Sequence, residues 1–181
     1  MTKRSLPTPE QLRELLRYDP NTGKLYWRPR DRSSFPCERI YNAWKTYREG
    51  KEALTSANDL GYKRGNIMGM TLRAHRVAWA IFYGEWPKLF IDHINSDSSD
   101  NRIINLREAS AQQNNFNQRP YKNATSNLKG VYFDKQTGRW RSKIRVNGKH
   151  IHLGRFDNEA EAHAAYCAAA NKYHGEFART E

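Results

Sequence analysis

The sequence predicts an α+β protein made of two domains joined by a short polar linker. Near the C-terminus, apolar and basic residues alternate without a break over 140–146, followed by Asn147-Gly148 and then an alanine-rich segment. Strict alternation is typical of a half-buried strand, and Asn-Gly is the strongest short-range signal of a two-residue hairpin turn. Before residue 119, short strand patterns are interspersed with helical ones. Both parts therefore combine helices with antiparallel strands.

The first 60 residues begin with a helix and a turn. Thr8 followed by Pro9 predicts a helix start, because Thr caps helices and Pro suits the first helical position. The run Asp19-Pro20-Asn21-Thr22-Gly23 predicts a turn that leads into a strand over 24–27. Residues 28–60 have no legible pattern, and we assign no chemistry to residues 1–60.

Residues 61–118 predict a hairpin, a helix, a strand and a second helix. The hairpin spans 61–71 with Met68-Gly69 near its turn, and a helix over 77–82 ends at Gly84. Residues 91–94 form a short strand-like run. Ser110, with Gln113 three residues later, is a capping signal that starts the last helix of this part.

Residues 127–181 predict a three-stranded antiparallel sheet packed on one helix. Folding about Asn147-Gly148 pairs Arg145 with His150, Lys143 with His152, and Ser142 with Leu153. A third strand lies at 131–133, and Asn158 caps a helix of about 14 residues. One face of this sheet is covered by the helix, and the other face is basic.

The charge of the chain predicts a polyanionic partner. It has 31 Lys and Arg against 19 Asp and Glu, and residues 129–155 carry eight basic residues against Asp134 alone. No apolar run is long enough for a membrane span, and no secretory signal is visible. Two cysteines give no disulfide framework, and they are too few for a four-thiolate zinc site. A reducing cytoplasm is expected.

The basic strand face has two interpretations. Most charge alternation is a solvated face, but a solvated face usually mixes signs and this one does not, which favours nucleic-acid contact. The segment resembles the DNA-binding domain of plant ethylene-response factors (APETALA-like), and more closely its phage and bacterial relatives. The motifs that carry this resemblance are Leu128-Lys129-Gly130-Val131-Tyr132, Gly138-Arg139-Trp140, His152-Leu153-Gly154-Arg155-Phe156, Glu159-Ala160-Glu161-Ala162 and His174-Gly175-Glu176-Phe177-Ala178.

This resemblance implies binding to double-stranded DNA through the sheet. In the plant family, strand Arg and Trp side chains read bases in the major groove. Here Arg145 is kept, whereas Tyr132, Lys143 and His152 replace Arg, Glu and Trp, so DNA binding carries over and base preference does not. The expected DNA-binding residues are Lys129, Tyr132, Arg139, Arg141, Lys143, Arg145, His150 and His152.

Asp92-His93 is the candidate reactive pair. Hydrolysis of a phosphodiester needs a base to activate water and a cation to neutralise charge on the phosphate. His93 can be the base, because its ordinary pKa near 6.5 leaves much of it neutral. Asp92 and Asn114 offer hard oxygen ligands, which suit Mg²⁺ or Mn²⁺. By itself the dipeptide favours the simpler interpretation, in which Asp92 caps a turn and His93 is an ordinary polar core residue.

The spacing of the whole segment is more specific. Asn105 follows His93 by twelve positions and Asn114 by a further nine, a pattern that resembles the HNH endonuclease ββα-metal motif. The version is that of phage and intron-encoded homing endonucleases, in which the last His is Asn. The flanking segments agree: Ala74-His75-Arg76-Val77-Ala78-Trp79, Asp100-Asn101-Arg102, Asn105-Leu106-Arg107 and Gln113-Asn114-Asn115.

The resemblance assigns roles to individual residues. His93 is the general base, and Asp92 and Asn114 bind one divalent cation, Mg²⁺ or Mn²⁺. Asn105 ties the loop together and orients His93. His75 makes either a structural hydrogen bond or a phosphate contact. Arg102 and Arg107 are phosphate clamps, with a solvated charge as the alternative for each.

The sequence thus predicts a site-selective DNA endonuclease with a ββα-metal core over 61–118, and residues 1–60 are an N-terminal helix and strand region of the same nuclease half. A linker over 119–126 and a DNA-binding domain over 127–181 follow. The protein is expected to act in the cytoplasm of a phage-infected bacterial host, as a monomer or homodimer. No membrane binding and no obligatory protein partner are expected. The rival is a non-catalytic, sequence-specific DNA-binding regulator on the same scaffold. Target sequence and nicking versus double-strand cleavage stay open.

Overall fold

The computed structural model describes residues 5–118 and 125–180. The chain divides into two compact units, with the boundary between Glu108 and Ala109. Each unit combines helices with antiparallel strands, so the predicted α+β class is confirmed. The units divide ahead of the linker predicted over 119–126, most of which lies outside the described residues. Among the described residues, no helix has the length and apolarity needed to cross a membrane.

The first unit begins with a helix and a two-stranded sheet. Helix α1 spans Pro9–Leu15, and Thr8 and Gln11 form a capping box in which each side chain bonds the other's backbone N–H. Strands β1 (Leu16–Asp19) and β2 (Lys24–Trp27) pair antiparallel around the predicted turn. The local signals of this segment therefore produced the expected helix, turn and strand.

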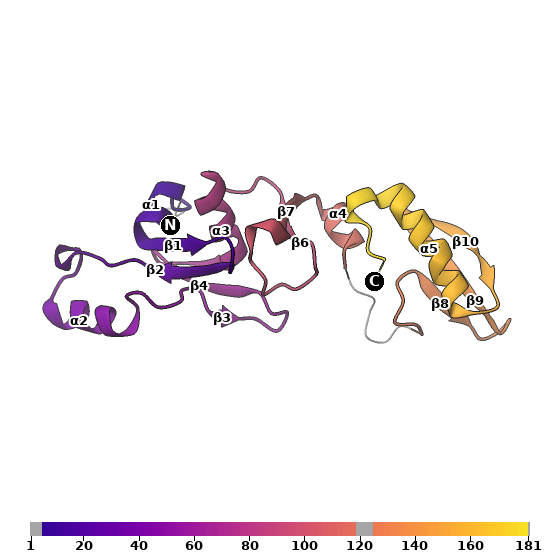
Figure 1. The fold of residues 1–181 in the computed structure, drawn as a ribbon, viewed down its shortest axis with the longest axis horizontal. Helices are drawn as coiled ribbons and strands as arrows, with labels where there is room; N and C mark the ends of the chain where they lie inside the picture. Colours follow the sequence, from indigo (N-terminus) through magenta and orange to yellow (C-terminus); the bar gives the residue numbers. More distant parts are fainter. Residues whose placement is uncertain (1–4, 119–124, 181) are drawn as a thin grey trace. The chain divides into compact units, whose positions relative to one another are not determined.

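A second sheet follows an excursion of the chain. The excursion contains the 3-10 helix η1 (Arg32–Ser34) and helix α2 (Glu38–Tyr47), which Figure 1 shows apart from the sheets of this unit. Strands β3 (Ser56–Ala57), β4 (Lys63–Ile67) and β5 (Met70–Arg73) then form a three-stranded sheet. Met68 and Gly69 join β4 to β5 with φ angles of 51° and 77°, as a two-residue type I′ hairpin turn requires.

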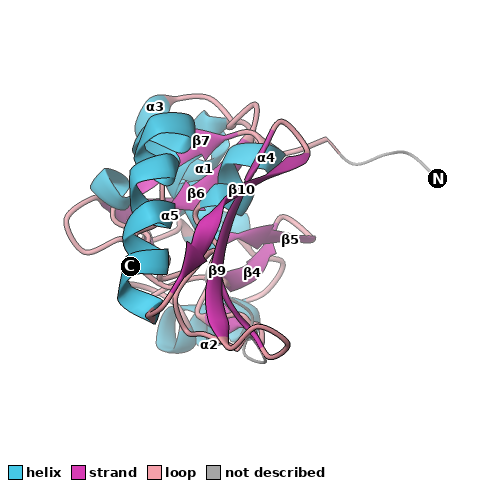
Figure 2. Ribbon diagram, turned by 90° about the vertical axis from the view of Figure 1, so that its right-hand side faces the viewer, coloured by secondary structure: helices cyan, strands magenta, loops and turns pink. Residues whose placement is uncertain are grey.

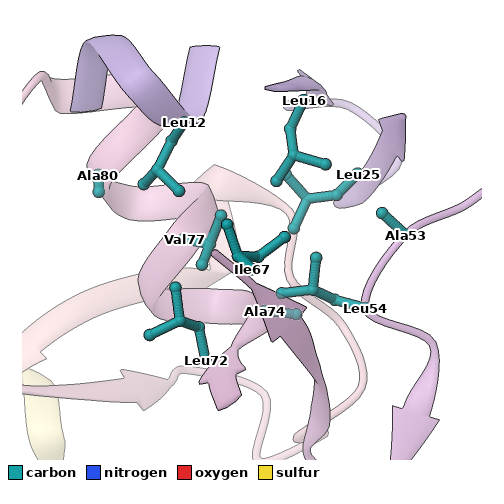
Figure 3. Packing of buried hydrophobic residues seen from close by; sticks show 10 residues of the cluster. All are labelled: Leu12, Leu16, Leu25, Ala53, Leu54, Ile67, Leu72, Ala74, Val77 and Ala80. Atoms are coloured by element: carbon teal, nitrogen blue, oxygen red, sulfur yellow. The ribbon is translucent and has the colours of Figure 1, made fainter. Parts of the chain in front are cut away.

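Helix α3 (Ala74–Tyr83) packs against strands β1, β4 and β5 and contributes several residues to the core. It ends at Gly84, which adopts the left-handed conformation that favours glycine at a helix end. Figure 3 shows the side chains of α1, α3 and the strands meeting in one cluster. The buried members are Leu12, Leu16, Leu25, Ala53, Leu54, Ile67, Leu72, Ala74, Val77 and Ala80.

A third, two-stranded sheet completes the first unit. Strand β6 (Phe90–His93) pairs with β7 (Leu106–Ala109), and the 3-10 helix η2 (Ile103–Asn105) precedes β7. The last residue of β7 is the first residue of the second unit. This small sheet is the part of the fold that positions Asp92 and His93.

The second unit is a sheet covered by one helix. Helix α4 (Ala111–Phe116) precedes strands β8 (Val131–Asp134), β9 (Arg139–Val146) and β10 (Lys149–Phe156), whose order is β10-β9-β8. Helix α5 (Glu159–His174) lies along the sheet (Figure 2), and the 3-10 helix η3 (Gly175–Phe177) follows it. Ile144 of β9 packs against Tyr166 and Ala170 of α5. The predicted three-stranded sheet on one helix is therefore confirmed.

The register of β9 and β10 follows the prediction up to a bulge. Arg145 pairs with His150 and Lys143 with His152, as the Asn-Gly turn predicted. The predicted pairing of Ser142 with Leu153 is wrong, because the register shifts between His152 and Gly154 and Ser142 faces Gly154. A bulge inserts one residue into one strand, and that shift moves every later side chain to the opposite face.

Candidate active site and nucleic-acid interface

Asp92 and His93 are the last two residues of β6, and both side chains are buried. The strand is anchored by Ile91, which packs with Leu106 of β7 and Ala78 of α3. Two polar side chains at the end of an apolar strand thus lie on a frame of three packed elements. Such support favours a fixed side-chain geometry.

His93 is held by an amide that the sequence analysis did not single out. The carbonyl oxygen of the Asn101 side chain lies 3.0 Å from His93 Nε2 and accepts its hydrogen bond. In the neutral ring, this arrangement leaves Nδ1 as the basic nitrogen. Burial lowers the pKa of His93, although the bond to Asn101 and the charge of Asp92 oppose that shift. The imidazole is therefore neutral at pH 7 and able to accept a proton.

The β1–β2 hairpin positions Asn101 from the other side. The Tyr18 hydroxyl donates to the backbone oxygen of Asn101 at 2.7 Å, and burial raises the pKa of Tyr18. Gly23, at the hairpin turn, has a φ of 71°, and a Cβ there would lie 2.5 Å from the backbone nitrogen of Arg102. The hairpin therefore packs directly on the backbone that carries the partner of His93.

We expect Gly23→Ala to impair both stability and cleavage, because the new methyl group displaces the backbone beside Asn101. The matched control is Gly50→Ala, since Gly50 has a φ of 70° but no atom within 4 Å of its Cβ position. The control should lose about 1–2 kcal/mol of unfolding free energy through backbone strain. Gly23→Ala should lose about 1–3 kcal/mol more through the clash. Denaturant unfolding measures both losses, and equal losses would contradict the proposed packing.

Asn105 binds the loop that follows β6. Its side-chain oxygen accepts from the backbone N–H of Asn95 at 2.9 Å, and its side-chain amide donates to the backbone oxygen of Asp100 at 2.8 Å. The two bonds join both ends of the loop over 95–100. Asn101 bonds the His93 ring directly, whereas Asn105 bonds the loop that joins His93 to Asn101.

Asp92 forms a buried ion pair with Arg107. Nη2 and Nε of Arg107 lie 2.8 Å and 2.9 Å from Asp92 Oδ2, and the two side chains are 16% and 5% exposed for Arg107 and Asp92. A buried carboxylate requires such a partner, because an unpaired charge in this position is costly. Arg107, expected as a phosphate clamp, therefore lies on the carboxylate expected to bind the metal.

The donor chemistry around β6 fits a hard divalent cation. Asp92 offers carboxylate oxygen, and amide oxygens are the other ligand type in this motif, a set that suits Mg²⁺ or Mn²⁺. Among the residues that the structure describes, no group of three or more His, Cys, Asp or Glu side chains forms a metal cluster.

His75 lies against His93 from helix α3. Its ring is 3% exposed, with its centroid 5.2 Å from that of His93 and 5.4 Å from that of Tyr62. Within the described part of the chain, His75 Nδ1 is a buried atom without a hydrogen-bond partner. Burial lowers the pKa of His75 to about 3, and the neighbouring His93 adds to the shift. A neutral His75 packs against the proposed base.

The stability of the protein should fall in acid because His75 is buried neutral. Its pKa is about 3 in the folded state and about 6.5 when unfolded, so the unfolded chain binds an extra proton between these values. The contribution of His75 to the free energy of unfolding is fully present above about pH 6.5. It decreases as the pH falls towards 3, by at most ~1.4 kcal/mol per pH unit. Urea midpoints of the wild type and His75→Gln over this range measure the effect. Parallel pH profiles would contradict it.

Asn114 lies on α4, in the second unit. Helix α4 begins with a capping box, in which the Ser110 side chain accepts from the Gln113 backbone and Gln113 bonds back to Ser110. Asp92 belongs to the first unit. The joint role of Asn114 and Asp92 at one metal ion thus stays a prediction.

Lys129 and His174 fasten α4 within the second unit. Lys129 Nζ donates to the backbone oxygens of Asn115, Phe116 and Gln118, with distances of 3.3 Å to Asn115 and 2.7 Å to Gln118. The ring of Phe116 stacks on His174 with centroids 3.5 Å apart. A cation at the carbonyl end of a helix stabilises its last turn. Lys129, expected to contact DNA, thus holds α4 in this structure.

One face of the β10-β9-β8 sheet gathers most of the expected DNA-binding residues. Tyr132 lies opposite Arg141, while Lys143 and Arg145 lie opposite His152 and His150. The first strand residue of β9, Arg139, pairs with Asp157 at 3.1 Å. A face with this composition can bind a phosphate backbone.

Arg155 joins this face because of the bulge. The shifted register sets Arg155 opposite Arg141, whereas an unbroken register would set Gly154 there. Residues directly opposite in an antiparallel pair share one face. The sequence did not indicate this position of Arg155, since no residue pattern marks the extra residue at Leu153.

The cations of the interface have weak intramolecular partners. Arg141 lies 3.3 Å from Asp134, and the Lys143 ammonium lies 4.4 Å from the centre of the Tyr132 ring. In the first unit, Arg102 binds Asp100 at 2.6 Å, which lowers the pKa of Asp100 to about 2. The arginine side chains of both pairs are nearly half exposed, so they are accessible to a phosphate.

Comparisons with known proteins agree with both halves of this description. Residues 72–116 match the family model for the HNH endonuclease, and residues 126–176 match the AP2 domain. Protein 3.8 of Escherichia phage T7 is 33% identical over 108 residues, 59% of this chain and 88% of its own length. An uncharacterized HNH endonuclease, L560 of Acanthamoeba polyphaga mimivirus, is 30% identical over 141 residues, 77% of this chain and 67% of its own length. This chain belongs to the HNH endonuclease family.

The second unit contains the residues that match a different family model, the AP2 domain. The AP2-like ethylene-responsive transcription factor TOE2 of Arabidopsis thaliana is 34% identical over 84 residues, 46% of this chain and 17% of its own length. No solved structure matches the chain significantly. The HNH match runs from β5 through α4 and so crosses the division between the units. Family membership supports a nuclease-type function, and the two domains together point to DNA binding.

Proposed function

We propose that this member of the HNH endonuclease family hydrolyses phosphodiester bonds of duplex DNA with the help of Mg²⁺ or Mn²⁺. The observation that carries the proposal is the buried, neutral His93, held by Asn101 beside Asp92 within the matched residues. A base with its proton-accepting nitrogen fixed in place is what water activation requires.

Each residue of the site has a separate role in the proposed reaction. Nδ1 of His93 takes the proton from the attacking water, while Asn101 holds the ring and Asn105 holds the loop. Asp92 and Asn114 would bind the divalent cation, which when bound neutralises charge on the phosphate and leaving oxygen. Arg102 would contact phosphate oxygens of the DNA, and Arg107 would hold the carboxylate of Asp92 in place.

The AP2 domain would supply affinity and site selection through its sheet. The basic face, including Arg155, is suited to a duplex, since β-strands can enter the major groove. The relatives in phage T7 and mimivirus support action in an infected host cell. One HNH site per chain cuts one strand at a time, so a monomer would nick DNA and a double-strand break would need two sites.

A time course on supercoiled plasmid tests the proposal. With Mg²⁺ or Mn²⁺ we expect conversion first to nicked circles, and with excess chelator we expect no conversion. Protein that carries His93→Ala, purified in the same way, controls for contaminating nucleases. Equal cutting in chelator would overturn the metal-dependent mechanism. Tight DNA binding without cutting under any metal would favour the regulator instead.

A further inference from the structure

Residues 28–51, here called the α2 lobe, form an excursion of the first unit whose two ends are joined at Trp27. The backbone N–H of Trp27 donates to the Lys51 oxygen, and the N–H of Gly50 donates to the Trp27 oxygen, both at 3.0 Å. Figure 1 shows α2 as the helix of this lobe, standing apart from the sheets of the first unit. The lobe is therefore a closed excursion with its own surface.

The α2 lobe carries a strong excess of positive charge. It contains seven basic residues and three acidic ones, and none of the seven forms an ion pair with another described residue. One of the acidic residues, Asp31, caps the 3-10 helix η1, because its side chain accepts a hydrogen bond from the backbone N–H of Ser33 at 2.8 Å. The seven are Arg28, Arg30, Arg32, Arg39, Lys45, Arg48 and Lys51.

Aromatic rings hold several of these cations. The Arg30 guanidinium lies 4.8 Å from the centre of the Phe35 ring, and that of Arg48 lies 5.1 Å from the Trp27 ring. A ring face attracts a cation without neutralising its charge. The guanidinium groups are therefore oriented in advance and keep their charge for an anion.

The apolar side chains of the lobe pack mainly on one another. The Phe35 ring lies 5.5 Å from Tyr41 and 5.4 Å from Trp44, between centroids, and no residue of α2 is fully buried. Tyr41 and Trp44 are thus committed to this aromatic cluster. Ile40 and Tyr47 remain well exposed, too small an apolar surface for the broad apolar face of a membrane-bound helix.

We propose that the α2 lobe binds the phosphate backbone of duplex DNA, as a contact separate from the AP2 sheet. The inference rests on the proposed function, since it takes duplex DNA as the substrate. Planar guanidinium groups match phosphate geometry, and side chains already oriented by rings lose less entropy on binding. A contact to phosphates carries no base preference and adds affinity at any sequence.

The test uses three exposed cations of the lobe in the full-length protein. The variant combines Arg28→Gln, Arg39→Gln and Arg48→Gln, so that it removes exposed arginines and includes the ring-held guanidinium of Arg48. The control combines Lys24→Gln, Lys88→Gln and Lys172→Gln, the same charge change outside both proposed DNA surfaces. Anisotropy titrations of a labelled duplex in chelator, at several salt concentrations, give the affinity without cutting.

The salt dependence decides the outcome. Each lost phosphate contact flattens the plot of log affinity against log salt by about 0.9, so the lobe variant should lose about 3 units of slope and the control none. An unchanged slope in a folded lobe variant would overturn the proposal, whereas loss of binding to phosphatidylserine vesicles with an unchanged slope would overturn it in favour of a membrane surface. If the wild type itself does not bind the duplex, the proposed function fails as well.

Discussion

Replacing His93 with alanine should abolish DNA cleavage while leaving DNA binding nearly unchanged. The imidazole acts on water, whereas affinity comes from Lys and Arg contacts to phosphates. Loss of a general base costs at least ~10²-fold in rate. Single-turnover cleavage and anisotropy binding, measured on the same preparation, separate the two effects.

Two further variants make this test specific. His93→Gln keeps an N–H donor for Asn101 but has no basic nitrogen, so it should fold like the wild type and still fail to cut. His163→Ala removes a histidine of α5 that lies outside both proposed sites, and it should cut normally. Cleavage by His93→Gln within a few-fold of the wild-type rate would contradict the assignment of the base.

Asp92→Asn should have the second large effect, a loss of at least ~10²-fold in cleavage. Even outer partners of metal ligands cost 10–100-fold in metal affinity or activity, so a first ligand should cost no less. Calorimetric titration with Mn²⁺ should show weakened binding. Asp59→Asn removes an exposed carboxylate of the same unit and is the matched control, which should keep both properties.

The ion pair with Arg107 complicates the interpretation of Asp92→Asn, and a double variant resolves it. Asp92→Asn removes the negative charge from the ion pair with Arg107, and breaking a buried pair typically costs about 3–5 kcal/mol. Adding Arg107→Met removes the cation of the broken pair as well, so the double variant should regain stability and remain inactive. Recovery of cleavage together with stability would mean that Asp92 is structural.

The local elements could be predicted because their signals lie within a few residues. The Thr8 N-cap, the Ser110 cap with Gln113 and the Asn147-Gly148 turn all formed as expected. Each depends on hydrogen bonds or φ angles between near neighbours, which the residue types themselves determine. The family resemblance likewise followed from the spacing of His93 and Asn105, which needs no structure.

The interactions around these residues depended on packing. Asn101 reaches His93, and Arg107 reaches Asp92, across a loop whose path is set by Asn105 and by the β1–β2 hairpin. No periodicity or spacing indicates which of several neighbouring amides or cations makes such a contact.

What the sequence by itself determined was the type of those elements that carry local signals, the domain order, the family and the identity of the expected site residues. Only the tertiary structure decided that a bulge carries Arg155 onto the basic face, that Lys129 holds the end of α4, and that residues 28–51 form a basic lobe. The physical reason is the range of the interactions. Caps and turns are local, whereas strand register and cation partners depend on groups distant in the chain that meet only when the core has packed.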